Sequence, residues 1–509
     1  MKIVTAYEMQ QIDYATIDTY GLSGSILMER AGLSVARRIK SRFSRKPVIL
    51  LAGGGNNGGD GFVIGRELYN DGWNVKVFLF ANQEQLKGEA DFHCKIAKNF
   101  GTPIEEKTEI YMNELTNKII VDALLGTGLQ KNVKELIRQV IDTVNEAEGT
   151  QIVSVDIPSG ISSDTGQVMG TAIKAAFTVT FGLPKRGHYL YPGSAYRGEL
   201  FIEDIGFPRS LLELAQLRVE MSEPEQLGLL LPKRQKNAHK GNFGHVFLVA
   251  GSKGKTGAAL MAAKAALRSG AGLVTIGIPE SIIQTFASRV LEEMTLPLPC
   301  SEGYFTMDAF GPALQFLEQK ASVLAIGPGV SSEPETASFV RALCLESKVP
   351  VVIDADGINA FQEESQVLSQ IAAPCVITPH PGEMARLTGM SARQINDDRI
   401  HVAMEFAKVS NVHVLLKGSP TVLACPDDTV FINPTGNPGM ASAGAGDVLT
   451  GVISGLLGQG LLFMEGVKLG AYLHGLSGDI AASKNTEVAM TAGDILDCLP
   501  EAFKQLGIS

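Results

Sequence analysis

The sequence predicts an α/β protein with two domains, each built around a parallel sheet. Short apolar runs rich in β-branched residues alternate with helical patterns along the 509 residues, and most of these runs are continuously apolar. Strands that are covered on both faces have this composition, and the helical stretches between them supply right-handed crossovers. A chain of this length is also long for a single hydrophobic core.

The expected strands are distributed over the whole chain. In the first half they are residues 47–53, 74–80, 118–124, 151–157 and 177–182. In the second half they are residues 244–251, 272–279, 322–329, 349–356, 374–380 and 412–418, and residues 414–423 are expected to form a hairpin.

The pattern changes between residues 206 and 240, where proline, charge and short helical pieces are mixed. We therefore expect a domain boundary near residue 220, with one domain at 1–220 and the other at 221–509. No sequence repeat relates the two parts, so two different α/β domains are expected.

The composition is that of an ordinary globular protein. A net charge of −10 disfavours nucleic acid or an anionic membrane surface as the main partner. No run approaches the roughly 20 apolar residues that a membrane span needs, and the first residues contain no apolar signal segment. The six cysteines form no C-x-x-C pair and are expected to be reduced core residues. We expect a cytoplasmic protein.

Three polar turns follow strands of the first domain. "GGGNNGGDG" (53–61) lets backbone N–H groups approach a phosphate, although it is neither a G-x-G-x-x-G fingerprint nor a Walker A loop. Asp122 and Asp156 each end a strand before another glycine turn. Ligands of open parallel sheets bind outside the carboxyl ends of the strands, so the three turns are expected to share one crevice. A tight βα turn or a helix cap is the alternative for each turn taken alone.

These motifs resemble the epimerase domain of the bifunctional NAD(P)H-hydrate repair enzymes. The resemblance rests on "GGGNNGGDGF", "VDALLGTGL", "VDIPSGI…TG", "TFGLPKRGHYLYPG" and "ILMERAG" and covers about residues 1–215. It implies a Rossmann-like doubly wound sheet. It also implies a substrate, NADH or NADPH hydrated at C6 of the nicotinamide ring, whose R and S epimers the domain interconverts.

The resemblance also implies roles for individual residues. Asp156 is the expected proton-transfer group, because burial can raise a carboxyl pKa toward neutrality. Lys185 is a second catalytic candidate, with a solvated loop lysine as the alternative. A potassium ion is implied at Asn57, Asp122 and Ser159. The loops expected to bind the substrate contribute Asn56, Asn57, Gly58, Gly59, Asp60, Gly126, Thr127, Gly128 and Leu129.

The second domain carries "GNPGMASAGAGDVLTG" (436–451), a glycine- and alanine-rich run with one charged residue, Asp447. Such a run allows its N–H groups to form an anion-binding nest, which the following helix N-terminus reinforces. The Asp447 carboxylate is then placed to act as a base toward a hydroxyl group. The alternative is that Asp447 only caps its helix.

Other strand ends of the second domain carry polar residues. For Asp354 and Asp356, a ligand role and a structural turn both remain open. His380 and Glu383 stand at a Pro-Gly-Glu helix start, for which capping is the alternative. "GSKGKT" (251–256) is not a P-loop, because Ala250 occupies the position of the first glycine.

The motifs "HKGxxGHV", "AIGPGV", "DADGIN", "TPHPGEMARL", "LKGSPT" and "GNPGMASAGAGD" resemble the ribokinase-like, ADP-dependent (S)-NAD(P)H-hydrate dehydratase, over about residues 225–505. Ala443 and Ala445 stand where some relatives have glycine or serine. The resemblance implies that ADP phosphorylates the C6 hydroxyl, leaving AMP, and that phosphate is then eliminated. It also implies that Asp447 accepts the hydroxyl proton and that Mg²⁺ accompanies the transfer.

The residues expected to contact the hydrate are Gly329, His380 and Glu383. Those expected to contact the nucleotide are Lys417, Gly418, Ser419, Pro420, Thr421, Asn437, Gly439, Met440, Ala441, Ser442, Ala443, Gly444, Ala445 and Gly446.

The expected small-molecule partners are NADHX or NADPHX and ADP, and we expect a homo-oligomer. One alternative is a ribokinase-like small-molecule kinase fused to a nucleotide-binding module without activity. In another, the first domain serves only binding or oligomerisation. The sequence does not distinguish NADHX from NADPHX or ADP from ATP.

Overall fold

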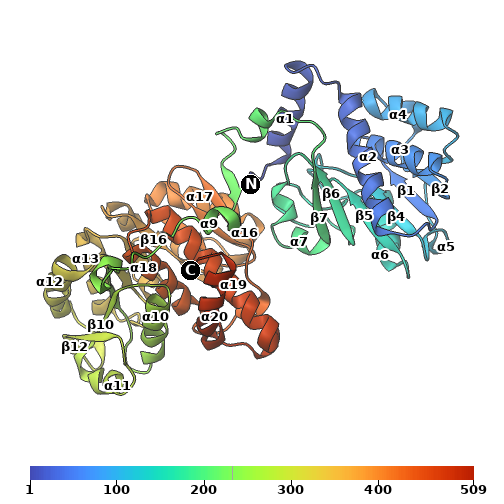
Figure 1. Cartoon of the computed structure of the whole chain (residues 1–509). Helices are drawn as coiled ribbons and strands as arrows, with labels where there is room; N and C mark the ends of the chain where they lie inside the picture. Colours follow the sequence, from blue (N-terminus) through green and yellow to red (C-terminus); the bar gives the residue numbers. More distant parts are fainter. Residues whose placement is uncertain (232, 509) are drawn as a thin grey trace. The chain divides into compact units, whose positions relative to one another are not determined.

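The computed structural model describes residues 1–231 and 233–508. The chain divides into two compact units, Lys2–Arg218 and Val219–Ser509, and Met1 belongs to the second (Figure 1). We call them the first and second domains and describe each by itself.

The first domain contains a seven-stranded sheet in which every adjacent pair is parallel, in the order β3-β2-β1-β4-β5-β6-β7. The five strands expected from the sequence are confirmed as β1, β2, β4, β5 and β6. The edge strands β3 and β7 were not expected, because they are short or half-exposed and lack a continuous apolar run. The strands are β1 Val48–Ala52, β2 Val75–Leu79, β3 Ile104–Glu106, β4 Ile119–Ala123, β5 Gln151–Val155, β6 Phe177–Phe181 and β7 Glu199–Glu203.

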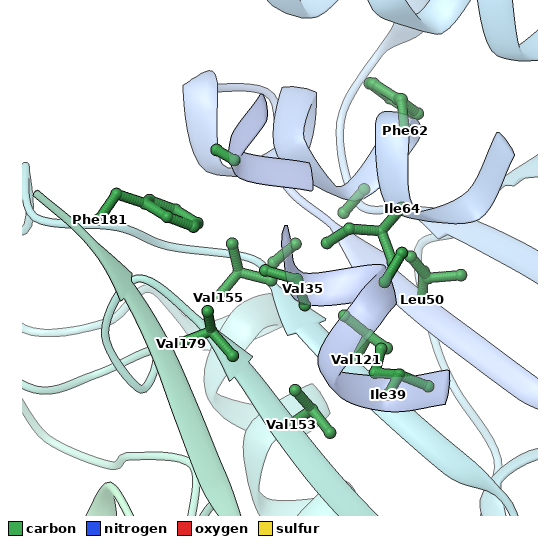
Figure 2. Packing of buried hydrophobic residues seen from close by; sticks show 14 of the residues in the cluster. Val35, Ile39, Leu50, Phe62, Ile64, Val121, Val153, Val155, Val179 and Phe181 are labelled. Carbon is green, nitrogen blue, oxygen red and sulfur yellow. The ribbon is translucent and has the colours of Figure 1, made fainter. Parts of the chain in front are cut away.

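Helices cover both faces of this sheet. Alternate residues of β1 enter opposite cores: Leu50 packs with α2 and α3, whereas Leu51 packs with α5 and α6. Figure 2 shows the first core, in which Val35 of α2 and Phe62 of α3 lie over the strands. The helices are α1 Ala6–Asp18, α2 Gly24–Arg42, α3 Asn56–Asn70, α4 Gly88–Asn99, α5 Met112–Leu115, α6 Glu135–Glu146, α7 Gly193–Tyr196 and α8 Arg209–Leu212, with the 3₁₀ turns η1 Gln83–Gln85 and η2 Arg186–His188.

The second domain contains a ten-stranded sheet in the order β11-β10-β9-β14-β15-β16-β17-β18-β19-β8. Its strands are parallel except for β18, which is antiparallel to both β17 and β19, so the expected hairpin is confirmed. The strands are β8 Val219–Met221, β9 His245–Val249, β10 Leu273–Pro279, β11 Met294–Leu298, β14 Val323–Ile326, β15 Val351–Ile353, β16 Cys375–Ile377, β17 His413–Leu416, β18 Thr421–Ala424 and β19 Val430–Asn433; a separate hairpin pairs β12 Cys300–Ser301 with β13 Tyr304–Phe305.

The helices α10 and α18 pack closely against each other beside this sheet. A Cβ at Gly451 would lie 2.1 Å from the carbonyl oxygen of Ala262, so glycine allows this approach. The helices are α9 Pro224–Leu227, α10 Thr256–Arg268, α11 Ile283–Ala287, α12 Phe310–Lys320, α13 Pro334–Glu346, α14 Asp356–Asn359, α15 Pro381–Thr388, α16 Ala392–Asp397, α17 Arg399–Ser410, α18 Ala445–Gly458, α19 Phe463–Ala489 and α20 Ala492–Gln505, with the 3₁₀ turns η3 Lys240–Phe243, η4 Glu280–Ile282, η5 Met307–Ala309, η6 Ser365–Gln370 and η7 Pro438–Met440.

The order of strands locates the ligand crevice of each sheet. In the first domain the chain progresses outward from β1 to β2 and β3, then returns to the other side of β1 with β4. In the second domain the same reversal occurs between β9 and β14. Ligands of open α/β sheets bind at such switch points, beyond the carboxyl ends of the strands.

Candidate functional site

The glycine turn of the first domain lies at the β1/β4 switch point. A Cβ at Gly53 would lie 2.0 Å from the carbonyl oxygen of Leu124, so the two strand ends meet only because residue 53 is glycine. Helix α3 begins directly after the turn, and its cap residue, Gly55, provides no side-chain hydrogen bond. The first N–H groups of α3 can therefore donate hydrogen bonds to an anionic ligand. This start of the helix carries the predicted substrate residues 56–60.

The three residues implied in potassium binding are held together around Leu125. Asn57 Nδ2 donates to the Leu125 carbonyl at 3.0 Å, and Ser159 Oγ accepts from the Leu125 N–H at 2.9 Å. Asp122 accepts from Ser159 Oγ at 2.5 Å. The Oδ1 atom of Asn57 is buried without a hydrogen-bond partner. The unpartnered Asn57 oxygen and the buried Asp122 carboxylate are donors of the kind that a hard cation takes, so the residues fit such an ion.

Asp156 and Lys185 form a buried ion pair. Lys185 Nζ donates to Asp156 Oδ1 at 2.5 Å and to Thr180 Oγ1 at 2.8 Å, and the lysine is 2% exposed. The alternative of a solvated loop lysine is therefore wrong. Asp156 itself has a φ of 64°, a backbone conformation uncommon outside glycine that clusters at functional sites.

The expected direction of the Asp156 pKa was wrong. Burial raises this pKa, but the charge and hydrogen bond of Lys185 outweigh burial, and the net pKa lies below the ordinary value. Asp156 is consequently ionised at neutral pH. His188 accepts from the Lys185 N–H with Nδ1 and faces the Asp156 carbonyl with Nε2, and burial lowers its pKa to about 3. His188 is therefore a neutral support of the pair.

Two further carboxyl groups interact with this pair. Burial, together with the charges of Asp156 and Asp13, raises the pKa of Asp60 well above its ordinary value. Burial raises the pKa of Asp13, on α1, to about 6, with Lys185 opposing and Asp156 adding to the shift. The sequence analysis did not identify Asp13, because it lies in an ordinary amphipathic helix with no motif around it.

The second predicted glycine loop borders a cavity of about 400 Å³. Gly128, Leu129, Lys131 and Lys134 line it, together with Leu125 of the potassium-site cluster. Both lysines are exposed. Thr127 accepts a hydrogen bond from Ser163 through its carbonyl, and Gly126 lies against Asn57. The loop thus joins the cluster of Asn57, Asp122 and Ser159 to a cavity with a positive rim.

In the second domain, Asp447 does not cap its helix. The cap position of α18 is Gly444, with φ of 92°, and no side chain bonds to the helix start there. Asp447 lies in the first turn, and no hydrogen bond of its carboxylate occurs within the described residues. Burial, followed by the charge of Asp354, raises its pKa to about 7, whereas Lys417 lowers it and Asp356 raises it. A pKa near neutral pH is the value that suits a general base.

The nest before α18 retains a free polar group. The Oγ atom of Ser442 is buried and has no hydrogen-bond partner. By contrast, Asn437 is engaged by the protein: its Nδ2 donates to Asp479 at 3.0 Å and its Oδ1 accepts from the Gly439 N–H. Met440 packs against Gly478. Residues 437 and 440 are therefore tied to α19, and residues 441–446 form the part of the predicted nest that leads into α18.

Lys417 occupies the carboxyl end of β17, next to this nest. Its Nζ donates to Asp354 Oδ1 at 2.8 Å and lies 3.8 Å from Glu383 Oε2. Burial lowers the lysine pKa, but the charges of Asp354, Glu383 and Asp447 raise it further, so the net shift is upward. Of the predicted residues 418–421, Thr421 Oγ1 donates to the Gly418 carbonyl at 3.2 Å and closes the hairpin turn.

His380 and Glu383, which were expected to contact the hydrate, form a capping box at the start of α15. Glu383 accepts from the His380 N–H at 2.7 Å, and His380 Nδ1 accepts from the Gly382 N–H at 3.0 Å. Both residues therefore cap the helix, which was the alternative for this helix start. Glu383 also faces Lys417. Gly329 lies at the β14 end, and its carbonyl accepts from Ser252. Asp356 pairs with Lys255 at 2.9 Å, next to the same turn.

His474 was not assigned to the site from sequence. It is buried on α19, and its Nε2 lies 2.9 Å from the carbonyl oxygen of Ala445 at the start of α18. Burial lowers its pKa to about 4, so it is neutral at physiological pH. No local sequence signal marks it, since the contact joins residues 29 positions apart.

Residues 1–231 and 233–508 contain neither of two features that would change the assignment of the site. Neither a cluster of three or more His, Cys, Asp or Glu side chains arranged for a metal ion nor a helix long and apolar enough to cross a bilayer is present in these ranges.

Both halves of the chain match known protein families. Family models match residues 24–187 ("YjeF-related protein N-terminus") and 246–501 ("NAD(P)H-hydrate dehydratase"). A bifunctional NAD(P)H-hydrate repair enzyme of Moorella thermoacetica is 42% identical over 519 residues, covering 99% of this chain and 97% of the relative. One of Thermofilum pendens is 39% identical over 514 residues, with coverages of 99% and 97%.

The second domain also has a counterpart among solved structures. A ribokinase-like superfamily protein of Enterococcus faecalis matches with a TM-score of 0.50 and 26% identity, over 57% of this chain and 97% of that chain. The expected fold class, an α/β protein whose second domain is ribokinase-like, is confirmed.

Proposed function

Because the chain belongs to the family of bifunctional NAD(P)H-hydrate repair enzymes, we propose that it restores NADH and NADPH that have become hydrated at C6 of the nicotinamide ring. The first domain interconverts the R and S hydrates. The second domain converts the S hydrate to NAD(P)H at the expense of ADP. The two activities belong together, because spontaneous hydration gives both epimers and only one is dehydrated.

In the first domain, Asp156 and Lys185 are the proton-transfer pair. Asp156 is ionised and accepts a proton from the hydroxyl or the ring of the hydrate, while the Lys185 ammonium donates one. The start of α3 and the loop 126–132 bind the diphosphate and the ribose. The short Asp156–Lys185 contact supports this assignment, because it holds a base and an acid side by side at the crevice.

A potassium ion fits the first domain at Asn57, Asp122 and Ser159. The orphaned Asn57 Oδ1 and the buried Asp122 carboxylate supply oxygen to a hard cation. When bound, the ion supplies positive charge next to the diphosphate. Asn57 and Ser159 then hold the Leu125 end of the loop against the ligand.

In the second domain, Asp447 accepts the proton of the C6 hydroxyl as its oxygen attacks the β-phosphorus of ADP. The bond from that phosphorus to the bridging oxygen breaks, and AMP leaves. The C6–O bond of the phosphate ester then breaks, releasing inorganic phosphate, and a proton leaves the neighbouring ring carbon to form the double bond. Residues 441–446 and Lys417 stabilise the charge on the transferring group.

We propose that Mg²⁺ enters the site bound to the phosphates of the nucleotide. Mg²⁺ in phosphoryl transfer is held largely by substrate phosphates and water, with few protein ligands. This mode agrees with the absence of a His, Cys, Asp or Glu metal cluster from the described ranges 1–231 and 233–508. The ion supplies charge neutralisation at the phosphates.

The observation that carries the proposal is the state of Asp447: a carboxylate in the first turn of an uncapped helix, with a pKa of about 7 and a lysine facing it. The test is to incubate the purified protein with a mixture of R and S hydrates, ADP, Mg²⁺ and K⁺. The absorbance of reduced nicotinamide should recover for all of the hydrate. Recovery of only the S fraction would remove the epimerase assignment, and a stable phosphorylated product would indicate a kinase.

A homo-oligomer stays a prediction, and the sequence left the choice between NADHX and NADPHX open. Lys131 and Lys134, on the rim of the cavity beside loop 126–132, are the cationic groups available to a ribose 2′-phosphate. We therefore propose that NADPHX is bound at least as well as NADHX. Sedimentation velocity measures the oligomeric state directly.

A further inference from the structure

Asp354 is a buried carboxylate that connects three elements of the second domain. It follows β15 and is 1% exposed. Its Oδ1 accepts from Thr378 Oγ1, beyond β16, at 2.6 Å and from Lys417 Nζ, beyond β17, at 2.8 Å. Its Oδ2 accepts from Thr450 Oγ1 of α18 at 2.9 Å. A buried carboxylate with this many charge-assisted hydrogen bonds holds its partners in a single geometry.

One of these bonds ties the first turns of α18 to the strand ends. Thr450 lies one helical turn beyond Gly446 and Asp447, so its bond to Asp354 holds the first turns of the helix against the strand ends. A Cβ at Gly446 would lie 3.3 Å from Lys417 Nζ and 3.5 Å from Asp354 Oδ2. The ammonium group is thus in direct contact with the end of the nest.

Lys417 keeps donors free for a ligand. An ammonium group has three donors. Among the described residues Lys417 uses one, toward Asp354, while Glu383 at 3.8 Å is beyond hydrogen-bond distance. The remaining donors can reach an anion held by residues 441–446. Asp354 therefore holds the lysine by one bond without saturating it.

We propose that Asp354 is a positioning residue for phosphoryl transfer, which orients the Lys417 ammonium toward the transferred phosphoryl group and sets the position of Asp447 through Thr450. This inference rests on the proposed dehydratase activity and assigns a role to a residue that the sequence left undecided. Its hydrogen bonds to Lys417 and to Thr450 of α18 distinguish it from a strand-end aspartate that only closes a turn.

The charges around Asp447 make the inference testable by pH. The groups that face it are Asp354 and Asp356, which raise its pKa, and Lys417, which lowers it; His474, packed against the same turn, is neutral. Removing the Asp354 charge lowers the Asp447 pKa, and removing the Lys417 charge raises it. The two opposite shifts test whether both charges face Asp447, and the loss of kcat tests the positioning role of Asp354.

The experiment compares the full-length wild type with Asp354→Asn and Lys417→Met, using S-hydrate, ADP and Mg²⁺. We expect at least a tenfold loss of kcat in Asp354→Asn with a smaller change in the KM for ADP. We also expect the acidic limb of the kcat profile to move to lower pH in Asp354→Asn and to higher pH in Lys417→Met. Loss of kcat with both limbs unmoved would overturn the inference.

A second pair of variants keeps the inference testable if Asp354→Asn does not fold. Thr450→Val removes one hydrogen bond to Asp354, and Thr336→Val removes a matched buried bond, from Thr336 Oγ1 to the Phe305 carbonyl at 2.8 Å. We expect kcat to fall at least threefold more in Thr450→Val than in Thr336→Val, and equal losses would contradict the proposal. If the wild type fails to dehydrate the hydrate, the proposed function fails; if it is active and the variants match it, only this inference fails.

Discussion

Asp447→Asn should abolish the dehydratase and at the same time stabilise the second domain. The folded-state pKa of Asp447 is about 7, against an ordinary value of 3.8. Between these two values the folded protein holds a proton that the unfolded chain has released. The stabilisation from this carboxyl is therefore fully present below pH 3.8 and is lost as the pH rises through 7.

The magnitude follows from this difference. About three pKa units correspond to roughly 4 kcal/mol at pH 8, at 1.36 kcal/mol for each unit. Asp447 is partly exposed, so solvent screening reduces this to about 1–2 kcal/mol. The uncharged amide of the variant avoids the cost of an ionised carboxylate in the folded state. The midpoint temperature of thermal unfolding for a domain of this size should therefore rise by roughly 2–6 °C at pH 8. The activity should fall by roughly 10²–10⁴-fold, because a general base is lost.

The assay is scanning calorimetry of wild type and Asp447→Asn from pH 4 to pH 8, without nucleotide, followed by dehydratase kinetics at pH 8. The gain in stability should be largest at pH 8 and should shrink toward zero as the pH approaches 4. A variant that is equally stable or less stable at pH 8, or a difference independent of pH, would refute the reasoning that burial and Asp354 hold the Asp447 proton.

Four further outcomes are expected. Asp156→Asn should reduce R-to-S conversion by at least roughly 100-fold, whereas dehydration of pure S-hydrate is retained; a parallel loss of both activities would contradict the division of labour. Asn57→Leu should remove the stimulation of epimerisation by KCl, measured against LiCl at the same ionic strength, and persistence of that stimulation would exclude the proposed cation site. Lys131→Ala combined with Lys134→Ala should raise the KM for NADPHX more than the KM for NADHX, and an equal effect on both substrates would show that neither lysine meets the 2′-phosphate. Gly451→Val should destabilise the second domain by about 3 kcal/mol or more, seen as a lower calorimetric midpoint, because its Cβ would lie 2.1 Å from the Ala262 carbonyl oxygen; an unchanged midpoint would mean that α10 and α18 separate at little cost.

The buried parallel strands could be predicted because each carries its own local signal. Residues 47–53 are apolar throughout and residues 118–124 are apolar except for Lys118 and Asp122, and these runs became β1 and β4. The edge strands β3 and β7 lack that signal, since one of their faces meets solvent. The glycine turns were also predictable, because a backbone that must approach another strand end or a phosphate can use little besides glycine.

The charge states of the site could not be predicted in this way. Burial alone suggested a raised pKa for Asp156, but Lys185, 29 residues away in the sequence, reverses the direction. Asp13 joins the same group of charges from the first helix without any motif. Electrostatic interaction depends on separation in space, and a local window of sequence contains no information about that separation.

Local residue patterns were enough to identify the buried strands, the glycine-rich turns and the carboxylates that end those strands, because these properties depend on a residue and its near neighbours. Which charges meet follows from long-range contacts of the folded chain: Asp354 binds Lys417 and Thr450 across 63 and 96 residues. Those contacts arise when parallel strands place their carboxyl ends along one edge of the sheet, and they set the protonation of the groups that the proposed chemistry uses.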